Sequence, residues 1–119
     1  MVKDNHIAVA GSIEAAVTHI RQGLPYPLTI EVETESLSMV EAALAADVDI
    51  IMLDNMSLAE MATAVTRIRQ IHPHVNIEAS GNVTLDTLRA VAETGVDYIS
   101  TSAPITRSTW LDLSMRIKF

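Results

Sequence analysis

Short apolar runs recur along this chain, and the stretches between them are amphipathic and long enough for one helix each. This alternation constrains the fold more than any other feature, because it is typical of βα units, in which parallel strands are joined by helical crossovers. The expected strands lie at residues 28–32, 48–53, 75–79 and 96–100, with a further strand near the start of the chain. We therefore predict an α/β fold with a parallel sheet of about four to five βα units.

Polar or small residues follow every one of these runs. In chain order they are Glu33, Asp54-Asn55, Ser80-Gly81-Asn82 and Thr101-Ser102. The carboxyl ends of parallel strands lie at the same edge of a sheet, so we expect these groups to meet there. Catalytic residues of α/β barrels occupy that edge. The sequence therefore predicts a site as well as a fold.

The length of the chain limits what this fold can be. The chain has 119 residues, whereas an eight-stranded α/β barrel takes about 250 residues. No linker or low-complexity tract divides the sequence. We therefore expect residues 1–119 to form a single unit, either an open βα sheet or part of a barrel.

Composition argues against several classes of protein. The net charge of −7 argues against non-specific binding of nucleic acid, which requires clustered Lys and Arg. No apolar run approaches the roughly 18 residues of a membrane helix, and the N-terminal residues lack the apolar segment of a signal peptide. The chain has no cysteine, which excludes disulfides. We expect a cytoplasmic protein that binds neither nucleic acid nor membranes.

Local signals predict where helices begin and end. Ser38 and Ser57 are each followed three residues later by glutamate, which is the spacing of a capping box. Asp47 and Gly95 are placed for the left-handed residue that ends a helix. Residues 110–119 alternate apolar and polar side chains, so we predict a half-buried strand there. The predicted N-caps are Ser12, Ser38, Ser57 and Thr84.

Glu33 and Asp54 end consecutive predicted strands. Two converging carboxylates can bind Mg²⁺, directly or through water, or accept hydrogen bonds from sugar hydroxyls. The alternative is that these acids only cap the following helices or remain solvated. Two acids on neighbouring strands favour the functional interpretation.

The loops after the third and fourth runs suggest a phosphate site. Ser80 and Gly81 precede a helix capped by Thr84, where backbone N–H groups and a hydroxyl suit a phosphate monoester. Thr101 and Ser102 hold the equivalent place in the next unit. Two consecutive late loops form the phosphate site of many barrels. The alternative is an ordinary tight turn that needs glycine for its backbone angles.

The first residues of the chain are polar. Lys3 would suit an anionic substrate, and Asp4 or His6 would orient it. Composition alone favours a disordered start, because chain termini are commonly loose. The His72-Pro73-His74 segment resembles a metal-binding pair, but we expect it to lie solvated in a surface loop.

Five segments, in this order and at these spacings, closely resemble the quinolinate phosphoribosyltransferase family. They are residues 3–8 (KDNHIA), 30–33 (IEVE), 51–56 (IMLDNM), 78–82 (EASGN) and 93–100 (ETGVDYIS). The resemblance covers essentially the whole chain. It implies the C-terminal part of an α/β barrel and an enzyme that makes nicotinate mononucleotide, pyrophosphate and CO₂. The implied substrates are quinolinate and phosphoribosyl pyrophosphate, with Mg²⁺ as cofactor.

The resemblance also implies roles for individual residues. Lys3 is similar to the lysine that contacts quinolinate. Glu33 and Asp54 resemble the acids that hold the ribose hydroxyls and the metal-bound diphosphate. Ser80 and Gly81 resemble the pair that binds the 5′-phosphate, and Thr101 and Ser102 belong to the same substrate-binding set. The sequence departs from the family at three positions, Asn82 and Ser102, where many members have glycine, and Arg107, where many have histidine.

Members of this family are more than twice as long as this chain. Their N-terminal domain and first barrel strands supply the basic cluster that binds quinolinate, so we expect residues 1–119 to be inactive alone. Family members are dimers or larger, so a homo-oligomer is expected. Two alternatives stay open. In the first, the chain is a non-catalytic module for binding or dimerisation. In the second, it is a different phosphate-binding barrel enzyme, a lyase or an isomerase.

Overall fold

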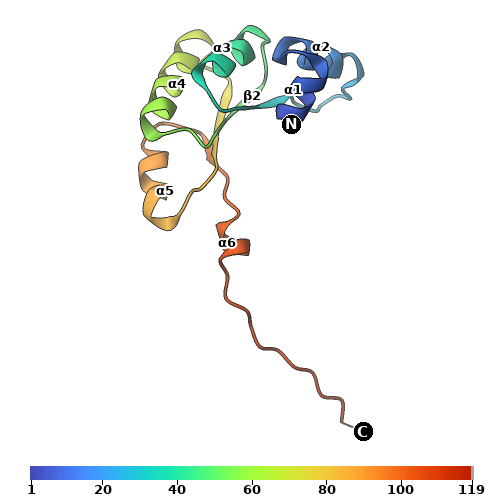
Figure 1. The fold of residues 1–119 in the computed structure, drawn as a ribbon, viewed down its shortest axis with the longest axis vertical. Coiled ribbons are helices and arrows are strands. Elements are labelled where there is room, and N and C mark those ends of the chain that lie inside the picture. The colour runs from blue at the N-terminus through green and yellow to red at the C-terminus, as the bar shows by residue number, and fades with distance from the viewer. Residues whose placement is uncertain (119) are drawn as a thin grey trace.

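The computed structural model describes residues 1–118, which form an α/β domain followed by an extended C-terminal tail (Figure 1). After the first helix, helices and strands alternate as predicted. In chain order they are α1 (Asp4–Ala10), α2 (Ile13–Gly23), β1 (Glu31–Thr34), α3 (Leu37–Ala45), β2 (Ile50–Asp54), α4 (Leu58–Ile71), β3 (Asn76–Ser80), α5 (Leu85–Ala92), β4 (Tyr98–Ile99) and α6 (Ala103–Thr106). None of the helices in this described part has both the length and the apolar character needed to cross a membrane.

The strands form one parallel sheet in the order β1-β2-β3-β4, which confirms the predicted fold class. Val2 makes a single parallel bridge to Val32 at the other edge of β1, where a further strand was expected. Between β2 and β3, Asp54 is paired in register with Ser80. This register places the polar ends of neighbouring strands side by side.

The helices cover one face of the sheet. Figure 1 shows α2, α3, α4 and α5 in an arc along one side, and successive helices in this arc contact one another. Val32, Leu53 and Ile77 are fully buried in the apolar core that forms between sheet and helices. Side chains alternate along a strand, so Glu33 and Glu78 point to the opposite face. A curved parallel sheet with helices outside is what part of an α/β barrel requires.

Most of the predicted caps are confirmed. The side chain of Ser12 accepts a hydrogen bond from the N–H of Ala15, and Ser57 forms the expected capping box with Glu60. Thr84 caps α5, although its box partner is a threonine. Asp47 and Gly95 both have the predicted positive φ, at 54° and 92°.

The predicted box of Ser38 with Glu41 is wrong. The cap of α3 is Ser36, whose hydroxyl accepts from the N–H of Met39 at 3.4 Å. Ser38 therefore lies inside the first turn of the helix. Glu41 is free to pair with Arg67 on α4, with 2.6 Å between Oε1 and Nε.

The first strand begins later than predicted. It covers Glu31–Thr34 rather than residues 28–32, and Leu28 is exposed instead of buried. The chain before it turns at Pro25 and Pro27. Glu33 is therefore part of the strand, on the face opposite the helices, and does not follow it.

The expectation of a disordered start is wrong. Residues 4–10 form α1, in which the N–H of Lys3 donates to Nδ1 of His6 at 3.0 Å. Val2 is buried and exchanges two backbone hydrogen bonds with β1, to Glu31 O and from Glu33 N. These bonds fix the position of Lys3 beside the first strand.

The predicted half-buried strand at the C-terminus is also wrong. Residues 110–118 contain no strand, and Phe119 lies outside the described residues. The apolar side chains of this tail are exposed, and Figure 1 shows it leading away from the sheet. Its alternating pattern suits a half-buried strand, but no neighbouring strand pairs with residues 110–118.

Candidate functional site

Glu33 and Asp54 lie at the carboxyl ends of β1 and β2, which are neighbours in the sheet. The Glu33 side chain is 13 % exposed, and its Oε2 accepts from the Nζ of Lys3 at 3.1 Å. Asp54 accepts a hydrogen bond from the side chain of Asn55 at 2.7 Å. Glu33 and Asp54, which the sequence predicts to meet at this edge, are therefore found together there, and Lys3 is paired with Glu33.

Lys3 reaches Glu33 because of its place in the chain. It is the N-cap residue of α1 and directly follows Val2. The backbone of Val2 is hydrogen-bonded to both Glu31 and Glu33. The hydrogen bond to Glu33 and the negative charge of that residue raise the pKa of Lys3, and the charges of Asp54 and Asp4 add to this effect. Lys3 is therefore a cation held at the edge of an acidic site.

Glu35 joins the two acids that the sequence singled out. One carboxylate oxygen from each of Glu33, Glu35 and Asp54 lies within 4.8 Å of the others, and we call this group the acid trio. Carboxylate oxygens are the ligands that Mg²⁺ prefers. The donor set of the acid trio therefore fits this ion. Glu35 was missed because it follows the strand in a loop; its spacing of two from Glu33 was the available signal.

The loop after β3 is held against the loop after β2 by Asn55. The N–H of Asn55 donates to Ser80 O at 3.1 Å, and its side-chain oxygen accepts from Asn82 Nδ2 at 3.1 Å. Gly81 has a φ of +88°, and a Cβ there would collide with the side chain of Asn55. The close approach of these two loops therefore requires glycine at position 81. Asn55 connects the acid trio to the predicted phosphate loop.

The predicted phosphate residues line one hollow of about 490 Å³, which we call the phosphate hollow. It brings together Ser80 and Gly81 from one loop with Thr101 and Ser102 from the next. Its other lining residues are Asn82, Val83, Ser100, Ala103, Thr106 and Arg107. The wall is rich in hydroxyl groups and carries one guanidinium, a chemistry suited to an anion.

The Thr101 hydroxyl is already used within the protein. It donates to Val83 O at 3.0 Å and accepts from the N–H of Ala103 at 3.2 Å. These bonds tie the loop after β4 to the segment before α5. Thr101 therefore shapes the phosphate hollow and is less suited to donate to a ligand than Ser80 or Ser102.

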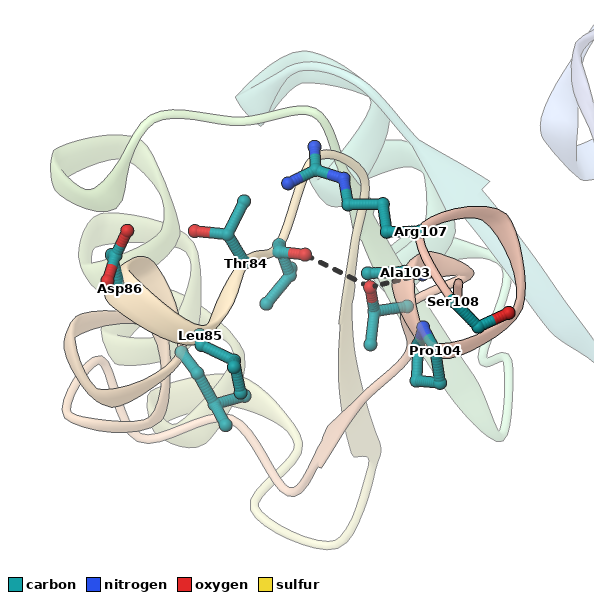
Figure 2. Close-up of a pocket in the computed structure, with 10 residues that line it drawn as sticks. Thr84, Leu85, Asp86, Ala103, Pro104, Arg107 and Ser108 are labelled. Carbon is teal, nitrogen blue, oxygen red and sulfur yellow. Dashed lines mark hydrogen bonds between the residues drawn. The ribbon is translucent and has the colours of Figure 1, made fainter. Parts of the chain in front are cut away.

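A second hollow of about 500 Å³ adjoins the first and is mainly apolar. Figure 2 shows it between Leu85 on α5 and Pro104 on α6, with the Arg107 side chain extending across it toward Thr84. Arg107 lines both hollows. Sequence reasoning noted this arginine as a departure from the family, and the structure places its cation at the phosphate hollow.

The open face of the sheet carries two further acids that the sequence analysis did not select. Glu78 accepts a short hydrogen bond from the hydroxyl of Ser100. Burial, followed by the charge of Glu78, raises the pKa of Glu31, and one carboxylate oxygen of Glu31 is buried without a hydrogen-bond partner among the described residues. Strand alternation was the signal that places both acids on the same face as Glu33.

Comparison with known proteins places the chain in a family. The family model "Quinolinate phosphoribosyl transferase, C-terminal domain" matches residues 1–116. The chain belongs to this family. A solved nicotinate-nucleotide pyrophosphorylase from Francisella tularensis overlays with a TM-score of 0.78 and 41 % identity, over 86 % of this chain and 35 % of that one.

Curated relatives agree with this membership of the quinolinate phosphoribosyltransferase family. The chain is 67 % identical over 117 residues to a probable nicotinate-nucleotide pyrophosphorylase (carboxylating) from Synechocystis, covering 98 % of this chain and 40 % of the relative. It is 40 % identical over 117 residues to the enzyme of that name from Rattus norvegicus, covering 98 % of this chain and 39 % of the relative. The chain thus spans about two fifths of the length of these relatives.

Proposed function

We propose that this chain provides the metal- and phosphate-binding part of a quinolinate phosphoribosyltransferase. The reaction joins the pyridine nitrogen of quinolinate to C1 of phosphoribosyl pyrophosphate, releases pyrophosphate and CO₂, and gives nicotinate mononucleotide. This transfer belongs to pyridine nucleotide biosynthesis, and we propose that the protein carries it out in the cytoplasm. The family membership and the geometry of the strand ends both support this proposal.

One observation carries the proposal. The strand that ends in the acid Asp54 is paired in register with the strand that ends in Ser80, and Asn55 bonds the two following loops together. The acid trio and the phosphate hollow are therefore adjacent parts of one site. A ribose with a 5′-phosphate has hydroxyls at one end and an anion at the other, which matches this arrangement.

The chemistry of the transfer suits these groups. The reacting sugar carbon gains positive charge as the pyrophosphate leaves, so the enzyme must hold the ribose in place and stabilise separating charges. Glu33 and Asp54 would accept hydrogen bonds from the ribose hydroxyls. Ser80, Ser102 and the backbone at Gly81 would hold the 5′-phosphate, with Arg107 supplying positive charge. Lys3 would contact a carboxylate of quinolinate.

Mg²⁺ is the proposed cofactor. Glu33, Glu35 and Asp54 would hold it, directly or through water. The chemistry that the bound ion would supply there is neutralisation of negative charge on the diphosphate leaving group. The acid trio would then have two roles, because carboxylates that hold the ion would also accept hydrogen bonds from the ribose hydroxyls.

The cations at this site are too few for two polyanionic substrates. Lys3 and Arg107 are the basic residues found at the acid trio and the phosphate hollow in residues 1–118. The net charge of the chain is −7. We therefore propose that catalysis requires basic groups from a further polypeptide segment, and that the chain alone does not turn over quinolinate.

Complementation tests this proposal. The purified chain is incubated with quinolinate, phosphoribosyl pyrophosphate and Mg²⁺, with and without a separate polypeptide carrying the remaining part of the Synechocystis relative. We expect no nicotinate mononucleotide from the chain alone and measurable product from the mixture. Glu33→Gln should abolish the activity of the mixture, whereas Glu93→Gln, in an exposed helix pair remote from the site, should retain it.

Two outcomes would contradict the proposal. Turnover by the chain alone would refute the need for further basic groups. A stable complex of the two polypeptides that makes no product would refute the assigned reaction. Binding of phosphoribosyl pyrophosphate by that inactive complex would instead support the non-catalytic binding module.

A further inference from the structure

The Lys3 ammonium occupies the carboxylate that the metal ion would need. Its Nζ lies 3.1 Å from Oε2 of Glu33, and Glu33 belongs to the acid trio. The exposed fractions of the two side chains differ, at 53 % for Lys3 and 13 % for Glu33. The acid is therefore held in the site, while the lysine can leave it for solvent.

One ammonium only partly balances the acid trio. Three carboxylates offer oxygens within 4.8 Å of one another, whereas Lys3 is paired with one of them. A divalent cation would take oxygens from all three and carry twice the charge. Two cations this close repel each other, so the metal ion would bind more weakly if the ammonium stayed on Glu33.

We propose that Lys3 is an exchangeable counter-ion, which a divalent cation at the acid trio displaces from Glu33. This inference rests on the proposed function, because it takes the acid trio as the Mg²⁺ site. The released ammonium remains tethered beside the site by α1 and by the bonds of Val2 to β1. Metal binding would thus free the cation that contacts quinolinate.

The lysine content of the chain allows a direct test. The chain has two lysines, Lys3 and Lys118, and the second lies in the exposed tail. The rate of acetylation of each is measured by tandem mass spectrometry, with MgCl₂ or with NaCl at equal ionic strength. We expect Mg²⁺ to speed acetylation of Lys3 by about two- to fivefold, the range that a partly exposed ion pair supports, and to leave Lys118 unchanged.

Variants separate displacement from general screening. In Glu33→Gln, Lys3 should be acetylated rapidly without Mg²⁺ and should not respond to it. Lys3→Met should tighten Mn²⁺ binding, measured by electron paramagnetic resonance, by about two- to fivefold. Arg67→Met removes a positive charge from the Arg67–Glu41 pair between α3 and α4 and should leave Mn²⁺ affinity unchanged.

The inference is overturned if Mn²⁺ binds equally well to the wild-type chain and to Lys3→Met, or if Mg²⁺ leaves Lys3 acetylation unchanged. Neither result would affect the phosphoribosyl transfer tested by complementation. Absence of any Mn²⁺ binding to the wild-type chain would overturn both the inference and the proposed metal site. The two proposals therefore fail by different measurements.

Discussion

Gly81 stands where the loop after β3 passes Asn55, between the acid trio and the phosphate hollow. Its φ of +88° is left-handed, and an added Cβ would lie 2.9 Å from the backbone nitrogen of Asn55 and would also meet its side chain. Because the backbone of Asn55 cannot easily move, a side chain at position 81 would displace the loop after β3. The backbone groups proposed to hold phosphate would move with it.

We expect Gly81→Ala to weaken binding of ribose 5-phosphate by about tenfold and to lower the free energy of unfolding by about 1–3 kcal/mol. Titration calorimetry and urea unfolding measure the two effects. Gly11→Ala is the matched control, because Gly11 also has a positive φ, of +91°, but has open space around its Cβ position. It should lose stability and keep phosphate binding. Equal loss of binding in both variants would contradict the role of the loop.

The residues of the site differ in how well the sequence predicts them. Glu33, Asp54 and Ser80 lie at the carboxyl ends of strands and Gly81 directly follows one, so their convergence follows from the direction of a parallel sheet. The place of Glu35 depends on how the loop after β1 turns. Loop geometry is set by contacts distant in sequence, which a pattern of spacing does not contain.

At the scale of elements, the same type of hydrogen bond, from a backbone N–H to an aspartate side chain, fixes the start of two strand pairs, β1–β2 and β3–β4. Asp49 accepts from the N–H of Ile30 at 2.7 Å, and Asp97 accepts from the N–H of Ile77 at 2.7 Å. Asp97 also receives two hydrogen bonds from Arg69 on α4. Burial raises the pKa of Asp97, but the hydrogen bonds from Arg69 and Ile77 and the charge of Arg69 outweigh it and hold that pKa below 3.8.

This lowered pKa predicts a pH dependence. A carboxylate with a lowered pKa in the folded state stabilises the fold above its unfolded value, 3.8, and this stability is lost as pH falls through the folded value. Asp97→Asn should therefore cost about 1–2 kcal/mol at neutral pH and flatten the fall in Tm below about pH 4. Thermal melts across pH measure both. Glu93→Gln, in an exposed i,i+4 pair, should change stability by less than about 0.5 kcal/mol.

The two serines before α3 test which one caps the helix. Ser36→Ala should destabilise the protein by about 1 kcal/mol, because Ser36 satisfies the free N–H of Met39. Ser38→Ala should have little effect, since Ser38 lies within the helix. Urea unfolding compares the variants. A larger loss for Ser38→Ala would show that the cap lies two residues further on.

The helices were easier to predict than the ends of the chain. Ser57 and Glu60 signal a cap through local spacing alone, whereas either Ser36 or Ser38 fits before α3, and the end of β1 decides between them. The start of α1 carries lysine at its N-cap, a residue type that does not usually mark a helix. Its position depends instead on the pairing of Val2 with β1, a contact between distant residues.

At the scale of the whole molecule, the tail contributes little to the fold. The apolar side chains of Trp110, Leu113 and Ile117 are exposed, and the core contains no residue after Ile99 among those described. Truncation after Ser108 should therefore leave Tm unchanged within about 2 °C. Circular dichroism melts measure this, and a large fall in Tm would show that the tail packs on the domain.

The sheet has two edges that pair with no long strand in residues 1–118. β4 spans two residues, and the other edge carries only the single bridge of Val2. Exposed edges pair with other chains, so we propose a homo-oligomer and expect self-association at micromolar concentration. Size-exclusion chromatography with light scattering measures the mass. A monomer that persists at high concentration would contradict this proposal.

The position of the first residues also bears on how the protein should be produced. Val2 is buried against β1, and the next residue pairs with the acid trio. An affinity tag fused before Met1 would emerge beside the site and disturb metal and anion measurements. The C-terminal tail leads away from the sheet (Figure 1), so a tag attached there leaves the pocket accessible.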